Sequence, residues 1–567
     1  MARTVSIGAQ GFAGIREGGY FLVDKTGFIR EWWRAGDQIT LVCRPRRFGK
    51  TLTLSMVECF LSLDYAGRGK ELFGGLAVWG DPDMRELQGK VPVISLSFAK
   101  VKRPTLDETL TELKRVMRVA VRAHDYLNES PALGADDREF LESVSDSMDN
   151  VTATSCLGEL CRMLYAHHGV KPVVLLDEYD TPMQEAWLNG YWDGMSSFVR
   201  SLFNSTFKTN PSLGRALITG ITRVASESIF SDLNNPKVVT VTTPAYETAF
   251  GFTQAEVDAA LEEFGMADMR DDVRDWYDGF TFGDVADVYN PWSITSFLDM
   301  GRLEPHWVNT SSNGLVSSLV RRGDEGLKRD FEALLSGGEV IKRVDERVDF
   351  RRLRTSPAAV FSLLLATGYL KVTSRSRRPD ADADDLSLAL TNREVRAGFD
   401  GLVRGWFCEE DTSYNGFVRS LLAGEAYDME CYLGDLADGV MSSFDSAARP
   451  SRNLPERFWH GLVLGLLVEL RGRYEVRSNP ESGRGRADVV LAPLDGPGGS
   501  DPAVVIEFKV LDPRRGERVL ADAVESALGQ IRDKRYAASL QERGIAPGRI
   551  RCYGIAFEGR RVLIGVG

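Results

Sequence analysis

The feature that most constrains this chain is a nine-residue loop, CRPRRFGKT, at residues 43–51. An apolar run at residues 39–42 precedes the loop, and an apolar-periodic segment at residues 52–63 follows it. This order predicts a strand, a loop and a helix. Because a helix N-terminus presents free backbone N–H groups, Gly-Lys-Thr at this place indicates a loop that binds phosphate.

The Gly-Lys-Thr end of the loop carries specific expected roles. Lys50 is expected to reach the β- and γ-phosphates of ATP, and the Thr51 hydroxyl is expected to ligate Mg²⁺. The usual pattern begins with a glycine five residues before the second one, and this chain has Arg44 there. On the tripeptide alone, a tight turn with a solvated lysine stays open as an alternative. The loop residues expected to hold the nucleotide are Arg47, Phe48, Gly49, Lys50, Thr51 and Leu52.

Composition limits the classes of protein that fit. A length of 567 residues suggests three or four domains. The net charge of −12 supplies no global positive field, so nucleic-acid binding would have to rest on local basic patches. Seven cysteines without a Cys-x-x-Cys pair favour a reducing compartment. Without a signal-peptide core or an apolar run of roughly 18 residues, we expect a soluble cytoplasmic protein with no membrane partner.

The first 245 residues alternate expected strands and helices. Long amphipathic helices are expected at residues 106–124 and 156–167. The expected strands are residues 39–43, 91–98, 173–176, 216–221 and 237–243. These strands are short and apolar on both faces, as in a buried parallel sheet. With a phosphate loop on the first strand, this alternation predicts an α/β domain with a doubly wound parallel sheet.

Polar side chains follow two of these strands. Asp177 and Glu178 end the third strand, where ligands sit in open parallel sheets. Asp177 is placed to hold the hydration shell of Mg²⁺, and Glu178 is placed to orient and polarise the attacking water. Two solvated acids that open a loop are the alternative. Thr219, Thr222 and Arg223 on the next strand are candidates for sensing the γ-phosphate, although a capping threonine at a strand end explains them equally well.

The last part of the chain carries a second group of acidic residues. Its expected elements are a helix at residues 455–471, strands at 487–491 and 504–510, and a helix at about 517–540. Side chains alternate along a strand, so Glu507 and Lys509 share a face on which Asp488 can converge. The two carboxylates and the Phe508 carbonyl would form an oxygen-lined Mg²⁺ site. Lys509 would position or help deprotonate the bound water, and Glu469 on the preceding helix would add a ligand or an outer acid.

These features leave simpler alternatives open. For Glu507 and Lys509 taken alone, the alternative is an ion pair between strand residues.

Arginines and a lysine flank the site and are expected to neutralise backbone phosphates. They are Arg471, Arg473, Arg477, Arg484, Arg486, Arg514, Arg515, Arg518, Lys534 and Arg535.

Seven motifs, in order along nearly the whole chain, resemble the AAA-ATPase-like family of bacterial proteins. They are YFLVDKT (20–26), RPRRFGKT (44–51), LDEYD (176–180), TGITR (219–223), WYDGF (276–280), YNPWS (289–293) and WVNT (307–310). The resemblance implies that Arg44 is a normal feature of this family's loop and that residues 24–26 lie near the nucleotide. Proteins of this family typically end in a PD-(D/E)XK nuclease domain. Asp488, Glu507, Lys509 and then Gln530 match its constellation.

The sequence therefore predicts four parts. They are an AAA-like P-loop ATPase domain (1–245), a helical and winged-helix-like lid (246–400), a helical connector (401–447) and a restriction-endonuclease-like α/β domain (448–567). The expected function is ATP-gated or ATP-driven, Mg²⁺-dependent hydrolysis of nucleic acid, DNA rather than RNA, with a role in defence against foreign DNA resting on analogy alone. The alternative is a nucleotide-dependent switch whose C-terminal domain binds nucleic acid without cutting it. A motor ranks last because helicase motifs are missing, and homo-oligomerisation is left open.

Overall fold

The computed structural model divides the chain into two compact units, Met1–Phe399 and Asp400–Gly567. The described residues are 2–224, 236–308, 319, 325–335, 337–344, 347–348, 350–353, 356–376, 385–399, 414–441, 456–467, 470, 473–478, 481–482, 485–496, 498–513, 516–559 and 561–567. No helix within these ranges is both long and apolar enough to cross a membrane.

The first unit is built on a parallel sheet with the strand order β2-β3-β4-β1-β6. Its strands are β1 (Ile39–Cys43), β2 (Val93–Ser97), β3 (Val173–Asp177), β4 (Arg215–Gly220) and β6 (Lys237–Val239). The predicted parallel α/β sheet is therefore confirmed. The last strand ends earlier than predicted because Thr240 accepts a backbone hydrogen bond from Thr243 and turns the chain.

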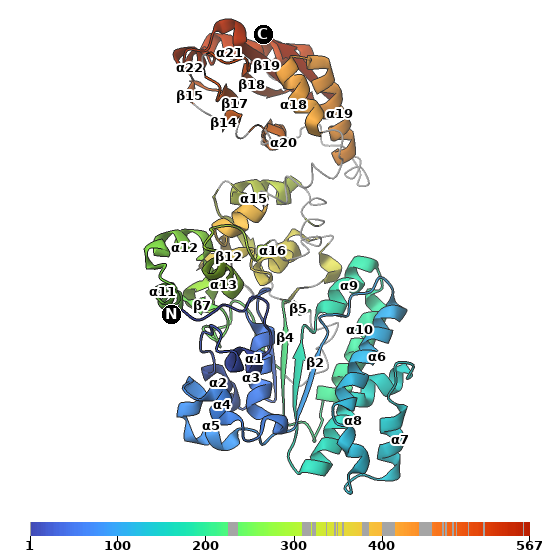
Figure 1. Cartoon of the computed structure of the whole chain (residues 1–567). Helices are drawn as coiled ribbons and strands as arrows, with labels where there is room; N and C mark the ends of the chain where they lie inside the picture. The colour runs from blue at the N-terminus through green and yellow to red at the C-terminus, as the bar shows by residue number, and fades with distance from the viewer. Residues whose placement is uncertain are drawn as a thin grey trace. The chain divides into compact units, whose positions relative to one another are not determined.

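Helices cover both faces of this sheet, which explains why its strands are apolar throughout (Figure 1). One group is α1 (Phe12–Glu17), α2 (Gly27–Ala35), α3 (Lys50–Leu61), α4 (Gly69–Phe73) and α5 (Pro82–Leu87). The other group is α6 (Leu106–Arg122), α7 (Ala135–Ser143), α8 (Asn150–His168), α9 (Thr181–Asn189) and α10 (Trp192–Phe207). Helix α8 begins before the expected residue 156 because Asp149 caps it by accepting the Thr152 N–H.

The rest of the first unit holds two small antiparallel sheets. One is β7 (Phe252–Thr253), β9 (Val285–Tyr289) and β8 (Phe280–Phe282), with helices α11 (Gln254–Glu263), α12 (Arg270–Tyr277) and α13 (Pro291–Met300). The other is β10 (Val340–Arg343), β13 (Asp385–Leu390) and β12 (Leu370–Ser376), with α15 (Glu325–Leu335) and α16 (Pro357–Ala366). The predicted hairpin is present as β12 and β13, and a winged-helix-like lid stays a prediction.

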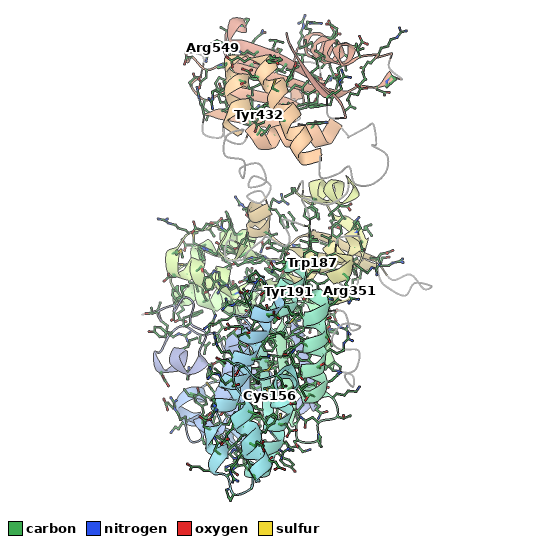
Figure 2. All side chains as sticks on the ribbon, turned by 90° about the vertical axis from the view of Figure 1, so that its right-hand side faces the viewer. Cys156, Trp187, Tyr191, Arg351, Tyr432 and Arg549 are labelled. Atoms are coloured by element: carbon green, nitrogen blue, oxygen red, sulfur yellow. The ribbon has the colours of Figure 1, made fainter. Side chains whose placement is uncertain are left out.

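A short strand links this region to the main sheet. Strand β5 (Arg223–Val224) pairs in parallel with β11 (Arg347–Val348). Phe350, just after β11, packs on Trp187 of α9 and Trp192 of α10. Figure 2 shows Trp187, Tyr191 and Arg351 close together at this junction. Residues 347–348 and Phe350 therefore contact both the segment after β4 and the helices after β3.

The second unit is a mixed sheet with the order β14-β17-β18-β19-β20, in which only β18 and β19 are parallel. Its strands are β14 (Tyr474–Ser478), β17 (Val489–Pro493), β18 (Ala503–Val510), β19 (Ile550–Glu558) and β20 (Arg561–Val566). A separate hairpin joins β15 (Glu481–Ser482) and β16 (Gly485–Arg486).

Helices pack on both faces of this second sheet. Helices α18 (Tyr414–Ala423), α19 (Ala426–Met441) and α20 (Glu456–Leu467) share one core with it, and α21 (Leu520–Lys534) and α22 (Ala538–Glu542) share the other. Residues 401–447, expected to be a connector, thus supply two helices that pack on the C-terminal sheet. Alternate β18 residues enter the two cores: Val504, Ile506 and Phe508 lie on one face, and Ala503 and Val505 on the other.

Candidate functional sites

The loop after β1 folds around the Lys50 amine. Gly49 adopts a left-handed φ of 78° immediately before α3, a conformation in which glycine avoids the strain of a side chain. The Lys50 Nζ donates to the carbonyl oxygens of Arg44 at 2.9 Å and Pro45 at 2.7 Å. Burial lowers the pKa of Lys50, and the nearby charges of Asp177 and Glu178 act in the opposite direction. The amine is thus held within the loop at the N-terminus of α3.

Asp177 connects the loop to the strands beside it. Its two carboxylate oxygens accept the Thr51 hydroxyl and the Thr219 hydroxyl, both at 2.6 Å. The strand order makes this possible because β4, which carries Thr219, lies between β3 and β1. The carboxylate and hydroxyl oxygens form a donor set that suits Mg²⁺. The structure thus brings together Thr51 and Asp177, the two residues expected to serve the metal of the nucleotide.

Glu178 lies at the sharp turn that follows β3. Its backbone is left-handed, with a φ of 50°, and its N–H donates to Asp177 Oδ1 at 3.0 Å. The Thr181 hydroxyl donates to Glu178 Oε2 at 3.0 Å and orients the carboxylate. Non-glycine residues keep such a backbone only where the surroundings fix it, and these positions gather at functional sites.

Asp180, next along the turn, has a different environment. Its buried carboxylate accepts the Thr222 N–H and hydroxyl, both at 2.8 Å, and the Ile221 N–H at 3.1 Å. The Thr222 hydroxyl is therefore engaged by a carboxylate, and sensing of the γ-phosphate by Thr222 stays a prediction. Arg223 lines a small cavity together with Cys43, and sensing of the γ-phosphate by Arg223 also stays a prediction.

Arg44, which stands where a glycine is usual, packs its side chain against the segment that follows β6. Its guanidinium is fully buried and donates to the Thr240 carbonyl at 2.6 Å and the Ala245 carbonyl at 3.2 Å. It also lies 4.6 Å from the centre of the Phe282 ring. Arg44 thus braces the loop against the segment that follows β6, which gives a physical reason for an arginine at this position.

Aromatic residues between 280 and 292 brace the loop from another side. Phe48 packs on Phe280 at 4.8 Å, and the Asn290 amide donates to the Arg46 carbonyl at 3.2 Å. The Arg47 guanidinium lies over the Trp292 ring at 4.2 Å. The stretch is rich in aromatic residues, a composition that by itself favours a buried core. The motifs at 276–280 and 289–293 thus supply buried core residues such as Tyr277 and Tyr289, and they also make direct contacts to the phosphate loop.

Residues 24–26 form a structural corner. The Asp24 carboxylate accepts the Thr26 hydroxyl at 2.6 Å and the Ala77 N–H at 2.7 Å. Lys25 pairs with Glu256 at 2.6 Å, and burial lowers the pKa of this lysine. These contacts join the start of α2 to α11, and a contact of this corner with nucleotide stays a prediction.

The second candidate site lies in the C-terminal unit, on β18 and beside β17. Glu507 and Lys509 share a face of β18, with the Lys509 Nζ 3.1 Å from Glu507 Oε1. Asp488 lies just before β17 and accepts the Phe508 N–H at 2.8 Å, while its own N–H lies 3.4 Å from Glu507 Oε2. The side-chain amide of Gln530, on α21, donates to Glu507. Asp488, Glu507, Lys509 and Gln530 are thus brought together.

The buried Glu507 carboxylate is the electrostatic centre of this site. Burial and then the charge of Asp488 raise the pKa of Glu507 to about 7, against the opposing effect of Lys509. Two carboxylates that repel one another in a buried place favour a bound cation, and carboxylate oxygens are the donors that Mg²⁺ prefers. Among the described residues, no three His, Cys, Asp or Glu side chains are grouped closely enough to hold a metal. Glu469, the expected additional acid, lies outside the described residues.

Tyr536 completes the surroundings of Glu507, and the sequence assigned it no role. Its buried hydroxyl accepts the Gln530 amide at 3.1 Å, so one amide contacts both Glu507 and Tyr536. The expected basic flank is partly paired: Arg473 binds Asp501 at 2.6 Å, and Arg477 binds Glu475 at 2.6 Å. Arg471, Arg484, Arg514 and Arg515 lie outside the described residues.

Comparison with known proteins matches two stretches of the chain, one in each unit. Residues 6–230 match the family described as predicted AAA-ATPase, and residues 454–566 match the PD-(D/E)XK nuclease superfamily. The chain thus carries an AAA-ATPase-like domain and a C-terminal domain of the PD-(D/E)XK nuclease superfamily, and the resemblance seen in the motifs is confirmed. An "Uncharacterized protein in vnfD 5'region" of Azotobacter chroococcum mcd 1 is 26% identical over 556 residues, covering 96% of this chain and 94% of that protein.

Proposed function

We propose that the first unit of this protein hydrolyses ATP and that its nucleotide state gates or drives Mg²⁺-dependent cleavage of DNA by the second unit. The observation that carries the proposal is the convergence of Asp488, Lys509 and Gln530 on the buried Glu507. The match to a nuclease superfamily over residues 454–566 supports the same reading. Defence against foreign DNA is part of the proposal only by analogy.

In the first unit, the proposed roles follow from where each group lies. The N–H groups at the start of α3 and the Lys50 ammonium bind the phosphates. Thr51 and Asp177 would hold Mg²⁺, which supplies positive charge beside the β- and γ-phosphates when bound. Glu178, oriented by Thr181, positions the attacking water and receives its proton on the way to the phosphate product.

In the second unit, Asp488 and Glu507 would hold Mg²⁺, which supplies a bound water of lowered pKa and positive charge beside the scissile phosphate. The Phe508 N–H fixes the Asp488 carboxylate, and the Gln530 amide fixes Glu507. The Lys509 ammonium, 3.1 Å from Glu507, is placed to position the water and to help remove its proton.

The decisive experiment incubates the purified full-length protein with supercoiled, linear and single-stranded DNA. Each substrate is tested with Mg²⁺ or with EDTA, and with ATP, a non-hydrolysable ATP analogue or no nucleotide. We expect cleavage only with Mg²⁺, and a cleavage rate that changes with the nucleotide. Lys50→Ala should remove the effect of ATP by weakening its binding, and unchanged ATP affinity in this variant would contradict the assignment of the phosphate loop.

One observation favours a second candidate function. Only two carboxylates, Asp488 and Glu507, meet in the described part of the second site, and Lys509 is already paired with one of them. A domain with this arrangement is also compatible with nucleotide-dependent binding of nucleic acid without cleavage. DNA binding that responds to ATP, without Mg²⁺-dependent cleavage of any of the three substrates, would select this function over the first.

A further inference from the structure

Two arginines of the phosphate loop, Arg44 and Arg47, are held in different ways. Arg44 is buried and donates hydrogen bonds to backbone carbonyls behind the loop. Arg47 is exposed, and among the residues described by the structure it has neither an ion pair nor a side-chain hydrogen bond. Its guanidinium lies over the Trp292 ring at 4.2 Å. Arg44 is therefore fixed, whereas Arg47 is held by a contact that it can leave.

The backbone of Arg47 is also unusual. Its φ is 66°, a left-handed value that is unfavourable for a residue with a β-carbon. Glu178, whose negative charge acts on Arg47, has the left-handed φ of 50°. Two residues with left-handed backbones and opposite charges thus lie near enough for their charges to interact, without forming an ion pair. Strain of this kind persists where surrounding contacts fix it, and it is common at catalytic positions.

The ring that supports Arg47 is itself firmly placed. Trp292 lies in the first turn of α13, and its backbone N–H donates to the side-chain oxygen of the capping Asn290 at 2.9 Å. The next residue, Ser293, donates to Glu394 at 2.7 Å. Glu394 is fully buried and also accepts the backbone N–H groups of His306 and Trp307, both at 2.7 Å. Trp292 is therefore a fixed platform for a movable cation.

We propose that the Trp292 ring holds the Arg47 guanidinium beside the phosphate loop, and that Arg47 leaves the ring to bind the γ-phosphate of ATP from within the same chain. This inference rests on the proposed ATPase function. A planar guanidinium offers two parallel N–H donors to phosphate oxygens, which an ammonium cannot do. A cation–π contact at an exposed site is weak enough to be exchanged for phosphate.

The proposed step requires no new reactant. The water oxygen bonds to the γ-phosphorus while the bond to the β–γ bridging oxygen breaks, and that electron pair stays on ADP. The water proton passes by way of Glu178 to the phosphate product. Arg47 exchanges no proton, since its guanidinium stays protonated throughout, and it stabilises the charge that develops on the phosphate oxygens.

The test compares ATP hydrolysis in Arg47→Ala, Arg47→Lys, Trp292→Phe and Trp292→Leu. We expect Arg47→Ala to lower kcat by ~100-fold or more, while the affinity for a non-hydrolysable ATP analogue changes far less. Arg47→Lys should restore little of this rate because a lysine lacks the planar pair of donors. Trp292→Phe should keep most of the rate, and Trp292→Leu should lower kcat by roughly 10-fold because Arg47 loses its platform.

Two further measurements separate positioning from structural damage. The variant Arg47→Ala/Trp292→Leu should be no slower than Arg47→Ala, since Trp292 acts only through Arg47. Binding of the analogue should also change the tryptophan emission of the wild-type protein by an increment that is missing from both Trp292→Phe and Arg47→Ala.

The matched control is Arg393→Ala, because Arg393 also lies over a tryptophan, Trp276 at 4.7 Å. This variant should keep the wild-type kcat.

Several results would overturn the inference. A normal kcat in Arg47→Ala removes the role of Arg47, and a loss in Arg393→Ala as large as that in Arg47→Ala points to general damage. Additive losses in the double variant remove the positioning role of Trp292. If the wild-type protein hydrolyses no more ATP than Lys50→Ala, the proposed ATPase function is wrong and this inference falls with it. A wild-type rate well above that of Lys50→Ala, with Arg47→Ala unaffected, contradicts the inference alone.

Discussion

The two candidate sites each contain a buried lysine, and the partners of these lysines are different. Lys50 and Lys509 are both only 7% exposed. Lys50 donates to two neutral backbone carbonyls, whereas Lys509 lies against the Glu507 carboxylate. In the first site the Lys50 ammonium makes its hydrogen bonds to carbonyls and not to the nearby carboxylates, so it stays available for an anion. In the second site two carboxylates and one ammonium leave an excess of one negative charge once Glu507 is ionised, which favours a cation.

This contrast teaches that burial alone does not define the chemistry of a lysine. A buried ammonium bound to carbonyl dipoles has its hydrogen-bonding needs met without being neutralised. A buried ammonium beside a carboxylate is neutralised, and its function then depends on what else that carboxylate binds. Lys50 is accordingly expected to act on phosphate directly, and Lys509 through water at a metal site.

The largest expected effect concerns the second site. Asp488→Ala or Glu507→Ala should abolish DNA cleavage and weaken Mg²⁺ binding, because each change removes a carboxylate ligand. Lys509→Ala should also abolish cleavage but leave both ligands in place, since an ammonium cannot coordinate Mg²⁺. The measurements are cleavage rates on the three DNA forms and Mg²⁺ titration by calorimetry.

The control for these variants is ATP binding, which should be unchanged because the phosphate loop lies in the other unit. Wild-type cleavage by Lys509→Ala would mean that Glu507 and Lys509 form only a structural ion pair. The proposal that the second site cleaves DNA would then be wrong.

A smaller effect, still of orders of magnitude, is expected at the first site. Glu178→Gln should keep ATP binding but slow hydrolysis by roughly 100-fold or more, because the attacking water loses its base. Steady-state hydrolysis and nucleotide titration of the same preparation separate these two quantities. If turnover survives, another acid must act, and Asp180 is next in the chain. Asp180 already accepts hydrogen bonds from Ile221 and Thr222, which leaves it less free to bind water.

Much of this arrangement could be predicted from the sequence because local patterns determine it. Short apolar runs between amphipathic helices predicted the parallel sheet, and the end of β3 placed Asp177 near Thr51. Alternation along β18 likewise placed Glu507 and Lys509 on one face. In each case the direction of the side chain follows from its position in a strand, because side chains alternate between the two faces.

The bracing contacts of the phosphate loop could not be predicted in this way. Asn290 and Arg46, which share a hydrogen bond, are 244 residues apart in the chain. An aromatic residue such as Trp292 fits a core and a cation platform equally well, and only the tertiary contact with Arg47 distinguishes them. Glu394 lies in no recognisable motif, yet its buried carboxylate accepts three hydrogen bonds from segments near residues 293 and 306.

The smallest expected effect is a pH dependence that belongs to the second site alone. Its cause is Glu507, whose pKa is raised from 4.5 to about 7 in the folded protein. A carboxyl with a raised pKa contributes stability below its unfolded pKa and loses that contribution as pH rises through the folded pKa. Without metal, the stability of the second unit should therefore fall between about pH 4.5 and pH 7, by roughly 1–3 kcal/mol.

Mg²⁺ should act against this loss, because metal binding requires the ionised carboxylate and its affinity should rise as pH passes 7. Denaturant unfolding of the metal-free protein, followed by proteolysis of the C-terminal unit, measures the first effect, and calorimetry at several pH values measures the second. Glu507→Gln is the matched control, since an amide of similar shape does not titrate and should remove both dependences. A pH dependence that persists in Glu507→Gln would assign it to other groups. The raised pKa of Glu507, on which the contrast between the two sites depends, would then lose its main support.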